Sequence, residues 1–162
     1  MQISQARTSL AGSLPTRSTL IQHILLKACG LYKVSPRCCE VPQLIEYKRG
    51  QFYRPHLDFN SNPRNSTQDP LFAESGQRAL SMVIYLNDDF DGGETNFTEL
   101  PRVCVKPCKG SVAAWWNKDQ RDGQMDSTTR HESLKVTRGT KYAMSIFVRE
   151  RPLTDPMHCA FN

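Results

Sequence analysis

The sequence has no run of about 20 apolar residues, the length that a helix needs to cross a bilayer. Its longest helix-like apolar segment, 20–31, is interrupted by Gln22, His23 and Lys27. The N-terminal residues also lack the basic start and apolar stretch of a secretory signal peptide. These absences predict no membrane-spanning segment and no membrane partner, and they make the cytoplasm the default compartment.

The chain also has no block of charge of one sign. Lys and Arg total 21 against 16 Asp and Glu, which gives a formal net charge of +5. Because basic and acidic residues are interleaved, a nucleic-acid or anionic-membrane surface is not required. A locally basic site would also suit a small anionic ligand.

Cysteine is present but shows no disulfide pattern. An even count of six in a chain without a visible signal peptide does not establish bridges. The adjacent Cys38 and Cys39 are hard to join as one ordinary bridge. We therefore expect buried or surface thiols, and the sequence leaves the disulfide state open.

The secondary structure expected from the sequence is one helix followed by short strands. Apolar residues recur at helical spacing across Ser18–Lys33. The strands that we expect are 43–47, 52–59, 79–86, 94–97, 103–105, 111–116, 134–136 and 141–149, with a long loop over 60–76. A chain of 162 residues with this pattern predicts one domain that is an antiparallel sandwich or barrel. The strand count favours a double-sheet jelly roll with one or two flanking helices.

Three residues form a candidate metal site. His56 and Asp58 have the i, i+2 spacing that places side chains on the same face of a strand. His131 begins a later strand and supplies a third candidate ligand. Two histidines and one carboxylate form the facial triad of non-haem Fe(II) oxygenases, which leaves metal positions open.

Lys141 is the candidate counter-ion. It lies ten residues after His131 in a mostly apolar strand. Burying a lysine without an anionic partner is costly. A dianionic 2-oxoacid that chelates a metal at one end needs such a cation at the other end.

Several segments resemble prolyl 4-hydroxylases. They are 47–59, which contains His56 and Asp58, and then 76–87, 92–97, 109–117 and 131–141 in the same order. The resemblance covers roughly residues 7–152 and implies a jelly-roll dioxygenase that uses Fe(II), 2-oxoglutarate and O2, with ascorbate keeping the iron reduced. It implies hydroxylation of a C–H bond, on prolyl residues of a peptide or protein substrate. It also implies a single domain over 1–162 truncated at its N-terminus, and it makes the endoplasmic reticulum a second candidate compartment.

The resemblance also assigns roles to residues. His56, Asp58 and His131 match the iron ligands, and Lys141 matches the residue that pairs with the distal carboxylate of 2-oxoglutarate. Three residues match family positions near that cosubstrate: Tyr47, Tyr85 and Thr95. Two residues, Tyr53 and Arg78, match positions that line the peptide groove, and Arg149 is a looser match to that groove. The loop over 60–76 stands where the family carries a mobile substrate-covering loop.

The sequence departs from the resembled family at three positions. Ser133 stands where the family usually has glycine, and Lys135 stands where it usually has proline. Phe147 replaces a tryptophan that collagen-type members often carry, which puts the same peptide substrate in question. We expect a less tight turn after His131 and a lysine near the cavity rim.

Other interpretations stay open from the residues alone. Lys141 can reach solvent from an edge strand, the tyrosines can be ordinary strand aromatics, and Arg78 can pair with a surface carboxylate. A nucleic-acid demethylase with the same cofactors is a second function, although nucleic acid is the less favoured partner. A catalytically silent jelly-roll binding module is a third. The sequence does not determine the oligomeric state.

Overall fold

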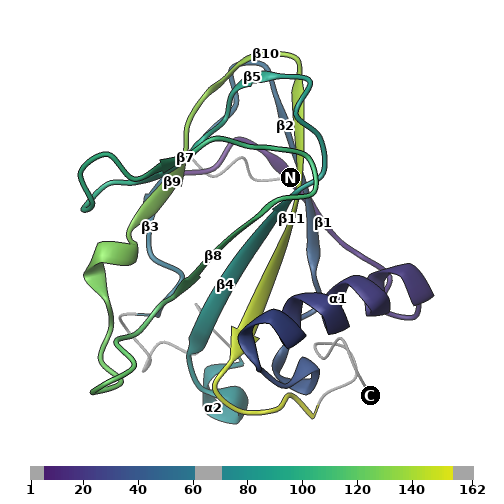
Figure 1. Cartoon of the computed structure of the whole chain (residues 1–162), viewed down its shortest axis with the longest axis vertical. Coiled ribbons are helices and arrows are strands. Elements are labelled where there is room, and N and C mark those ends of the chain that lie inside the picture. Colours follow the sequence, from purple (N-terminus) through teal and green to yellow (C-terminus); the bar gives the residue numbers. More distant parts are fainter. Residues whose placement is uncertain (1–5, 61–70, 155–162) are drawn as a thin grey trace.

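The computed structural model describes residues 6–60 and 71–154, and most of their regular structure is antiparallel β-sheet (Figure 1). The larger sheet has the strand order β1-β2-β11-β4-β8. These strands are Leu10–Ser13, Gln43–Lys48, Thr140–Arg149, Arg78–Tyr85 and Val112–Trp116, respectively. The long strand β11 lies between β2 and β4, so its residues are protected on both sides by neighbouring strands.

A second sheet has the strand order β3-β9-β6-β7. Its strands are Tyr53–His56, His131–Ser133, Thr95–Phe97 and Cys104–Val105. A two-stranded ribbon of β5 (Asp91–Gly92) and β10 (Val136–Arg138) completes the described strands. Residues of both sheets line one cavity, so the sheets enclose a common interior.

The helix α1 (Thr19–Tyr32) covers the outer face of the larger sheet. Its buried residues Leu25 and Cys29 join a core cluster with Met82 of β4 and Ile146 of β11. In Figure 1 the helix lies near β1 and β11, away from the smaller sheet. The remaining helical segments are η1 (Pro36–Cys38), α2 (Phe72–Ser75) and η2 (Ser127–Thr129).

The two faces of the larger sheet have different chemistry. Along β4, the apolar Leu80, Met82 and Ile84 pack toward α1, because alternate residues of a strand point to the same side. On the other face, Ser81 binds a side chain of the candidate site and Val83 lines the cavity. This explains why 79–86 looks almost continuously apolar, since both of its faces are buried.

The structure confirms the mostly β architecture with a flanking helix and corrects several boundaries. The expected strand over 52–59 ends at His56, and the expected strand over 134–136 is replaced by β9 and β10 on either side of Leu134 and Lys135. Strand β1 was not expected, because its residues are exposed and show no buried alternation. The expected loop over 60–76 contains α2, and its residues 61–70 lie outside the described residues.

Candidate metal and cosubstrate site

A cavity of about 180 Å³ lies between the two sheets. Most of its wall comes from β2 and β11 on one side and from β3 and β9 on the other. It is lined by Tyr47, Tyr53, His56, Asp58, Arg78, Thr95, His131 and Lys141 among the residues expected from the sequence. Of the expected site residues, Tyr85 and Arg149 do not line it.

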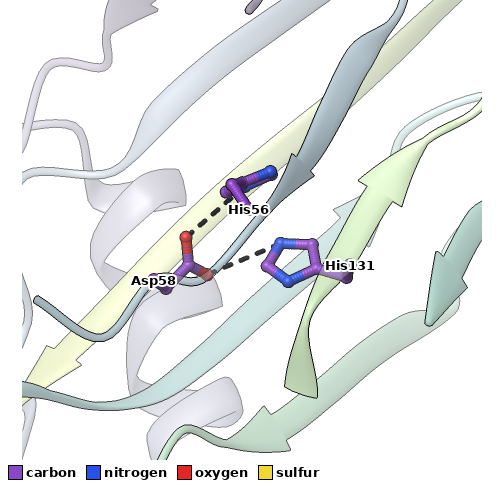
Figure 2. A group of neighbouring side chains, drawn as sticks. All are labelled: His56, Asp58 and His131. Atoms are coloured by element: carbon purple, nitrogen blue, oxygen red, sulfur yellow. Dashed lines mark ion pairs between the residues drawn. The ribbon is translucent and has the colours of Figure 1, made fainter. Parts of the chain in front are cut away.

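His56, Asp58 and His131 line this cavity, and their side chains converge on one another (Figure 2). The Nε2 atom of His56 lies 3.7 Å from Oδ1 of Asp58, and Nε2 of His131 lies 3.7 Å from Oδ2 of the same carboxylate. The three ligand atoms lie within 4.8 Å of one another. Asp58 follows the end of β3 rather than lying within it, so a bend of the chain, and not strand alternation, brings its carboxylate to His56.

Backbone carbonyls orient both imidazoles toward the shared carboxylate. Nδ1 of His56 is 2.8 Å from the carbonyl oxygen of Arg54, and Nδ1 of His131 is 2.9 Å from that of Thr129. A carbonyl accepts only, so each Nδ1 carries the proton and donates it. Each Nε2 therefore presents its lone pair, the arrangement that a metal-ligating histidine needs.

Two buried side chains form a chain of hydrogen bonds that ends at the carboxylate of Asp58. The hydroxyl of Ser81 donates to Oδ2 of Asp58 at 2.7 Å, and the amide of Asn117 donates to that hydroxyl at 2.8 Å. Ser81 and Asn117 are fully buried, so water does not compete for these bonds. Their participation was not predicted, since a serine in an apolar strand gives no sequence signal of its partner.

The charge states of His56 and Asp58 suit a divalent cation. Burial, followed by the effect of His131, lowers the pKa of His56 to about 4, so its imidazole is neutral at pH 7. Burial opposes ionisation of Asp58, but the two imidazoles, Arg78 and the Ser81 hydroxyl together lower its pKa below the usual value. A neutral imidazole beside an ionised carboxylate is the donor chemistry of a facial triad, so these residues fit an iron ion.

Lys141 lies in the same cavity and is only 2% exposed. Its Nζ donates to the carbonyl of Gly93 at 2.6 Å and to the hydroxyl of Ser133 at 3.0 Å. Within residues 6–60 and 71–154, no carboxylate forms an ion pair with it, and burial lowers its pKa to about 8. Because β11 is a central strand and Lys141 is buried, the alternative that this lysine reaches solvent from an edge strand is wrong.

Gly93 permits the close approach of this lysine. Its φ is +69°, and a Cβ atom there would lie 3.1 Å from Cδ of Lys141 and 3.1 Å from the ring of Phe90. A side chain at this position would therefore strain the backbone and require Lys141 or Phe90 to shift.

The other expected cosubstrate residues surround Lys141. The Lys141 ammonium lies 5.0 Å from the ring centre of Tyr47 and 5.4 Å from that of Tyr85. The hydroxyl of Tyr85 lies 2.7 Å from Oγ1 of Thr95, and only Thr95 of these two lines the cavity. Burial raises the pKa of both tyrosines, so they remain protonated donors at neutral pH.

The expected peptide-groove residues separate into two groups. Tyr53 stacks on His56 with ring centres 3.7 Å apart, and the guanidinium of Arg78 lies 3.8 Å from the ring centre of Phe147. Both Tyr53 and Arg78 line the cavity. Arg149 is 3% exposed and donates to Glu40 and to the carbonyl of Gly76, so its side chain is directed into the structure rather than into the cavity.

Glu40 connects the two arginines and was not predicted. Its carboxylate accepts from Nε and Nη2 of Arg78, both at 2.8 Å, and from Nε of Arg149 at 2.6 Å. Glu40 is 7% exposed, so the partner of Arg78 is a buried carboxylate and not the surface one considered from the sequence. Arg7 is another cavity residue to which the sequence assigned no role. Lys135 is exposed and does not line the cavity, unlike the expectation for this position.

No helix within the described parts of the chain is both long and apolar enough to cross a membrane.

Known proteins are similar in sequence to most of this chain. Prolyl 4-hydroxylase 1 of Arabidopsis thaliana is 29% identical over 144 residues, which cover 82% of this chain and 48% of that protein. The human prolyl 4-hydroxylase subunit alpha-3 is 30% identical over 131 residues, covering 80% of this chain and 23% of that protein. The chain thus spans less than half the length of these two relatives.

Solved structures share the fold. The 2OG complex of the viral collagen prolyl hydroxylase from Paramecium bursaria Chlorella virus-1 is 26% identical, with a TM-score of 0.72, over 89% of this chain and 80% of that one. A Pseudomonas putida prolyl-4-hydroxylase is 22% identical with a TM-score of 0.62, over 91% of this chain and 74% of that one, a likeness that supports the fold alone. The jelly-roll prediction is confirmed by the viral structure.

A protein-family model of the 2OG-Fe(II) oxygenase superfamily matches residues 42–149. This range contains His56, Asp58, His131 and Lys141. The expectation of Fe(II), 2-oxoglutarate and O2 as cofactors is confirmed by this match and by the metal-ligand cluster. The chain therefore belongs to the 2OG-Fe(II) oxygenase superfamily.

Proposed function

We propose that this chain forms one dioxygenase domain that hydroxylates prolyl residues of a peptide or protein. The observation that carries the proposal is the placement of the His56, Asp58 and His131 cluster and the buried ammonium of Lys141 in one cavity. A ligand that chelates a cation at one end and carries a carboxylate at the other matches both features. The names of the relatives support a prolyl substrate.

The three ligand residues would hold Fe(II) through Nε2 of each histidine and a carboxylate oxygen of Asp58. When bound, Fe(II) supplies the oxidising chemistry that, with O2 and 2-oxoglutarate, cleaves an unactivated C–H bond. Ser81 and the two backbone carbonyls keep the ligand atoms in place, which lowers the cost of assembling the site. Ascorbate, as the reductant that keeps the iron ferrous, is part of the proposal.

Lys141 would bind the distal carboxylate of 2-oxoglutarate. Its burial excludes water, which strengthens an ion pair with the ligand. Tyr47 and Thr95 line the same part of the cavity and would donate hydroxyl protons to the cosubstrate, with Tyr85 positioning Thr95.

The peptide would bind against Tyr53 and Arg78. The Tyr53 ring lies on the His56 imidazole, so a residue held against this ring is close to the metal site. Glu40 and Phe147 hold the guanidinium of Arg78 at the cavity wall, where a bound peptide would contact it. Arg149 would act through Glu40 rather than by touching the substrate.

An oxygen-free titration tests the cosubstrate site, and a peptide assay tests the activity. We expect 2-oxoglutarate to produce the visible charge-transfer band of the chelate in the Fe(II)-loaded protein, with saturable affinity. With O2, 2-oxoglutarate and ascorbate, a library of proline-containing peptides should yield hydroxyproline, detected by mass spectrometry together with succinate.

Two variants serve as controls for these assays. Asp58→Ala should lose the band through loss of iron, and Lys141→Ala should lose it through loss of 2-oxoglutarate. A folded protein that shows no band would refute the site and would favour a silent binding module. A band without any peptide hydroxylation would refute the prolyl substrate and lead to a test of methylated single-stranded nucleic acid.

A further inference from the structure

Ser133 is a cavity residue that the assigned roles leave unused. It is the last residue of β9, two positions after His131, and its side chain points to the same side as the His131 ring. It is 8% exposed and marks the point where the sequence departs from the glycine usual in the resembled family. The hydroxyl at this position is therefore a departure from the resembled family.

The hydroxyl of Ser133 belongs to the polar group around Lys141. Its Oγ accepts a hydrogen bond from the Lys141 ammonium at 3.0 Å, and it also hydrogen-bonds the phenol of Tyr47. Gly93 accepts a second proton of the ammonium, which leaves the third for a ligand. Ser133 thus adjoins the place where an anion would meet Lys141.

A serine in this position can serve two partners at once. Its oxygen accepts from the ammonium, while its own proton can turn either to the phenol oxygen of Tyr47 or to a bound ligand. An incoming carboxylate accepts that proton, and a hydrogen bond to a charged acceptor in a buried site is stronger than one between neutral groups. An aliphatic side chain here would remove the donor without removing Lys141.

We propose that Ser133 binds the distal carboxylate of 2-oxoglutarate together with Lys141. The inference rests on the proposed function, because it takes 2-oxoglutarate as the ligand of this cavity. It makes Ser133 a determinant of selectivity for 2-oxoacids that carry a second carboxylate.

The test compares two ligands that differ only at the distal end. Calorimetric titration of the Fe(II)-loaded protein without O2 would use 2-oxoglutarate and 2-oxopentanoate, in which a methyl group replaces the distal carboxylate. The variants are Ser133→Ala, which removes the hydroxyl, and Ser133→Thr, which retains it. Ser111→Ala, at a serine away from the cavity lining, is the matched control.

We expect Ser133→Ala to bind 2-oxoglutarate about tenfold more weakly, as loss of one hydrogen bond to a charged group predicts. Its affinity for 2-oxopentanoate should stay within about twofold of wild type, since that ligand has no distal acceptor. Ser133→Thr should restore most of the lost affinity, and Ser111→Ala should leave both affinities unchanged. Fe(II) affinity and thermal midpoint, measured on every variant, should stay at the wild-type values.

Three results would overturn the inference. Unchanged or tighter binding of 2-oxoglutarate by Ser133→Ala would mean that the serine only satisfies Lys141. An equal loss for both ligands, or a loss of Fe(II) affinity, would assign Ser133 to the shape of the metal site. If wild type itself bound no 2-oxoglutarate, the proposed function would fail as well, whereas unchanged binding by Ser133→Ala alone leaves that function intact.

Discussion

Replacing Lys141 with methionine separates the cost of burying its charge from the benefit of binding a ligand. Methionine retains the length and most of the apolar surface of lysine but has no ammonium. In the protein without ligand, burial lowers the pKa of Lys141 from 10.5 to about 8. At neutral pH this shift corresponds to a cost of about 3 kcal/mol in the free energy of unfolding.

The sign of the pH dependence follows from the direction of the shift. A base whose pKa is lower in the folded state makes the unfolded state bind more protons between the two values. The cost is therefore complete below about pH 8, falls as the pH rises toward 10.5, and is absent above it. About 2.5 kcal/mol of this cost should be recovered by pH 10.

Urea denaturation of wild type and Lys141→Met at several pH values between 7 and 10 measures this effect. The difference between the two unfolding free energies cancels the contributions of the tyrosines, which titrate in both proteins. We expect wild type to gain about 2.5 kcal/mol relative to the variant over this range. The exposed Lys27→Met serves as the control and should show no such change.

The same variant should lose 2-oxoglutarate binding far more than iron binding. Removing one partner of a buried ion pair costs about 3–5 kcal/mol, which is a loss of affinity of more than about 100-fold. Fe(II) affinity should remain near wild type, because the three ligand atoms are untouched. A difference in unfolding free energy that does not change with pH, or equal losses of iron and cosubstrate affinity, would refute this account of Lys141.

Three further predictions concern the metal, the peptide groove and the core. Asp58→Ala should lower Fe(II) affinity by at least about 100-fold, measured by competition with a chelator, because one of three ligands is lost and the two imidazoles remain. Arg78→Met and Arg149→Met each leave Glu40 buried with one partner fewer, so both should lower the free energy of unfolding, by about 3–5 kcal/mol for the buried Arg149. Only Arg78→Met should also raise the KM for peptide, without changing 2-oxoglutarate affinity; a raised KM in Arg149→Met alone would contradict the separation of the two arginines. Leu25→Ala should cost about 2–5 kcal/mol in urea denaturation, since Leu25 is fully buried between α1 and the larger sheet, and a smaller loss would mean that the helix is dispensable for the fold.

The structure brings together the three candidate metal ligands, but not through the local structure that the sequence predicted. The spacing of His56 and Asp58 predicted a shared strand face, yet β3 ends at His56. The carboxylate reaches its place because the chain bends after the strand and Ser81 and Asn117 hold it there. Strand boundaries depend on pairing with β9, a partner that is distant in the sequence, and local pattern does not contain this information.

The short strands around Lys135 illustrate the same limit. The apolar triplet 134–136 looked like one strand, but Leu134 and Lys135 lie between two strands that belong to different sheets. The apolar segment alone could not indicate that the chain passes from one sheet to another here. The two flanking strands pair with different partners, β9 with β6 and β10 with β5.

The sequence by itself indicated the fold class, the amphipathic helix, the three residues that the structure brings together as a candidate metal cluster, and the lysine that lies in the same cavity. These depend on periodicity and on residue types whose chemistry is restrictive, such as a lysine within an apolar strand. Only the tertiary structure decided that Glu40 binds both arginines, that Arg149 faces away from the cavity, and that Ser133 lies against Lys141. Such pairings join positions far apart in the chain, and their free energy comes from burial and hydrogen-bond geometry that exist only after the sheets have closed over the cavity.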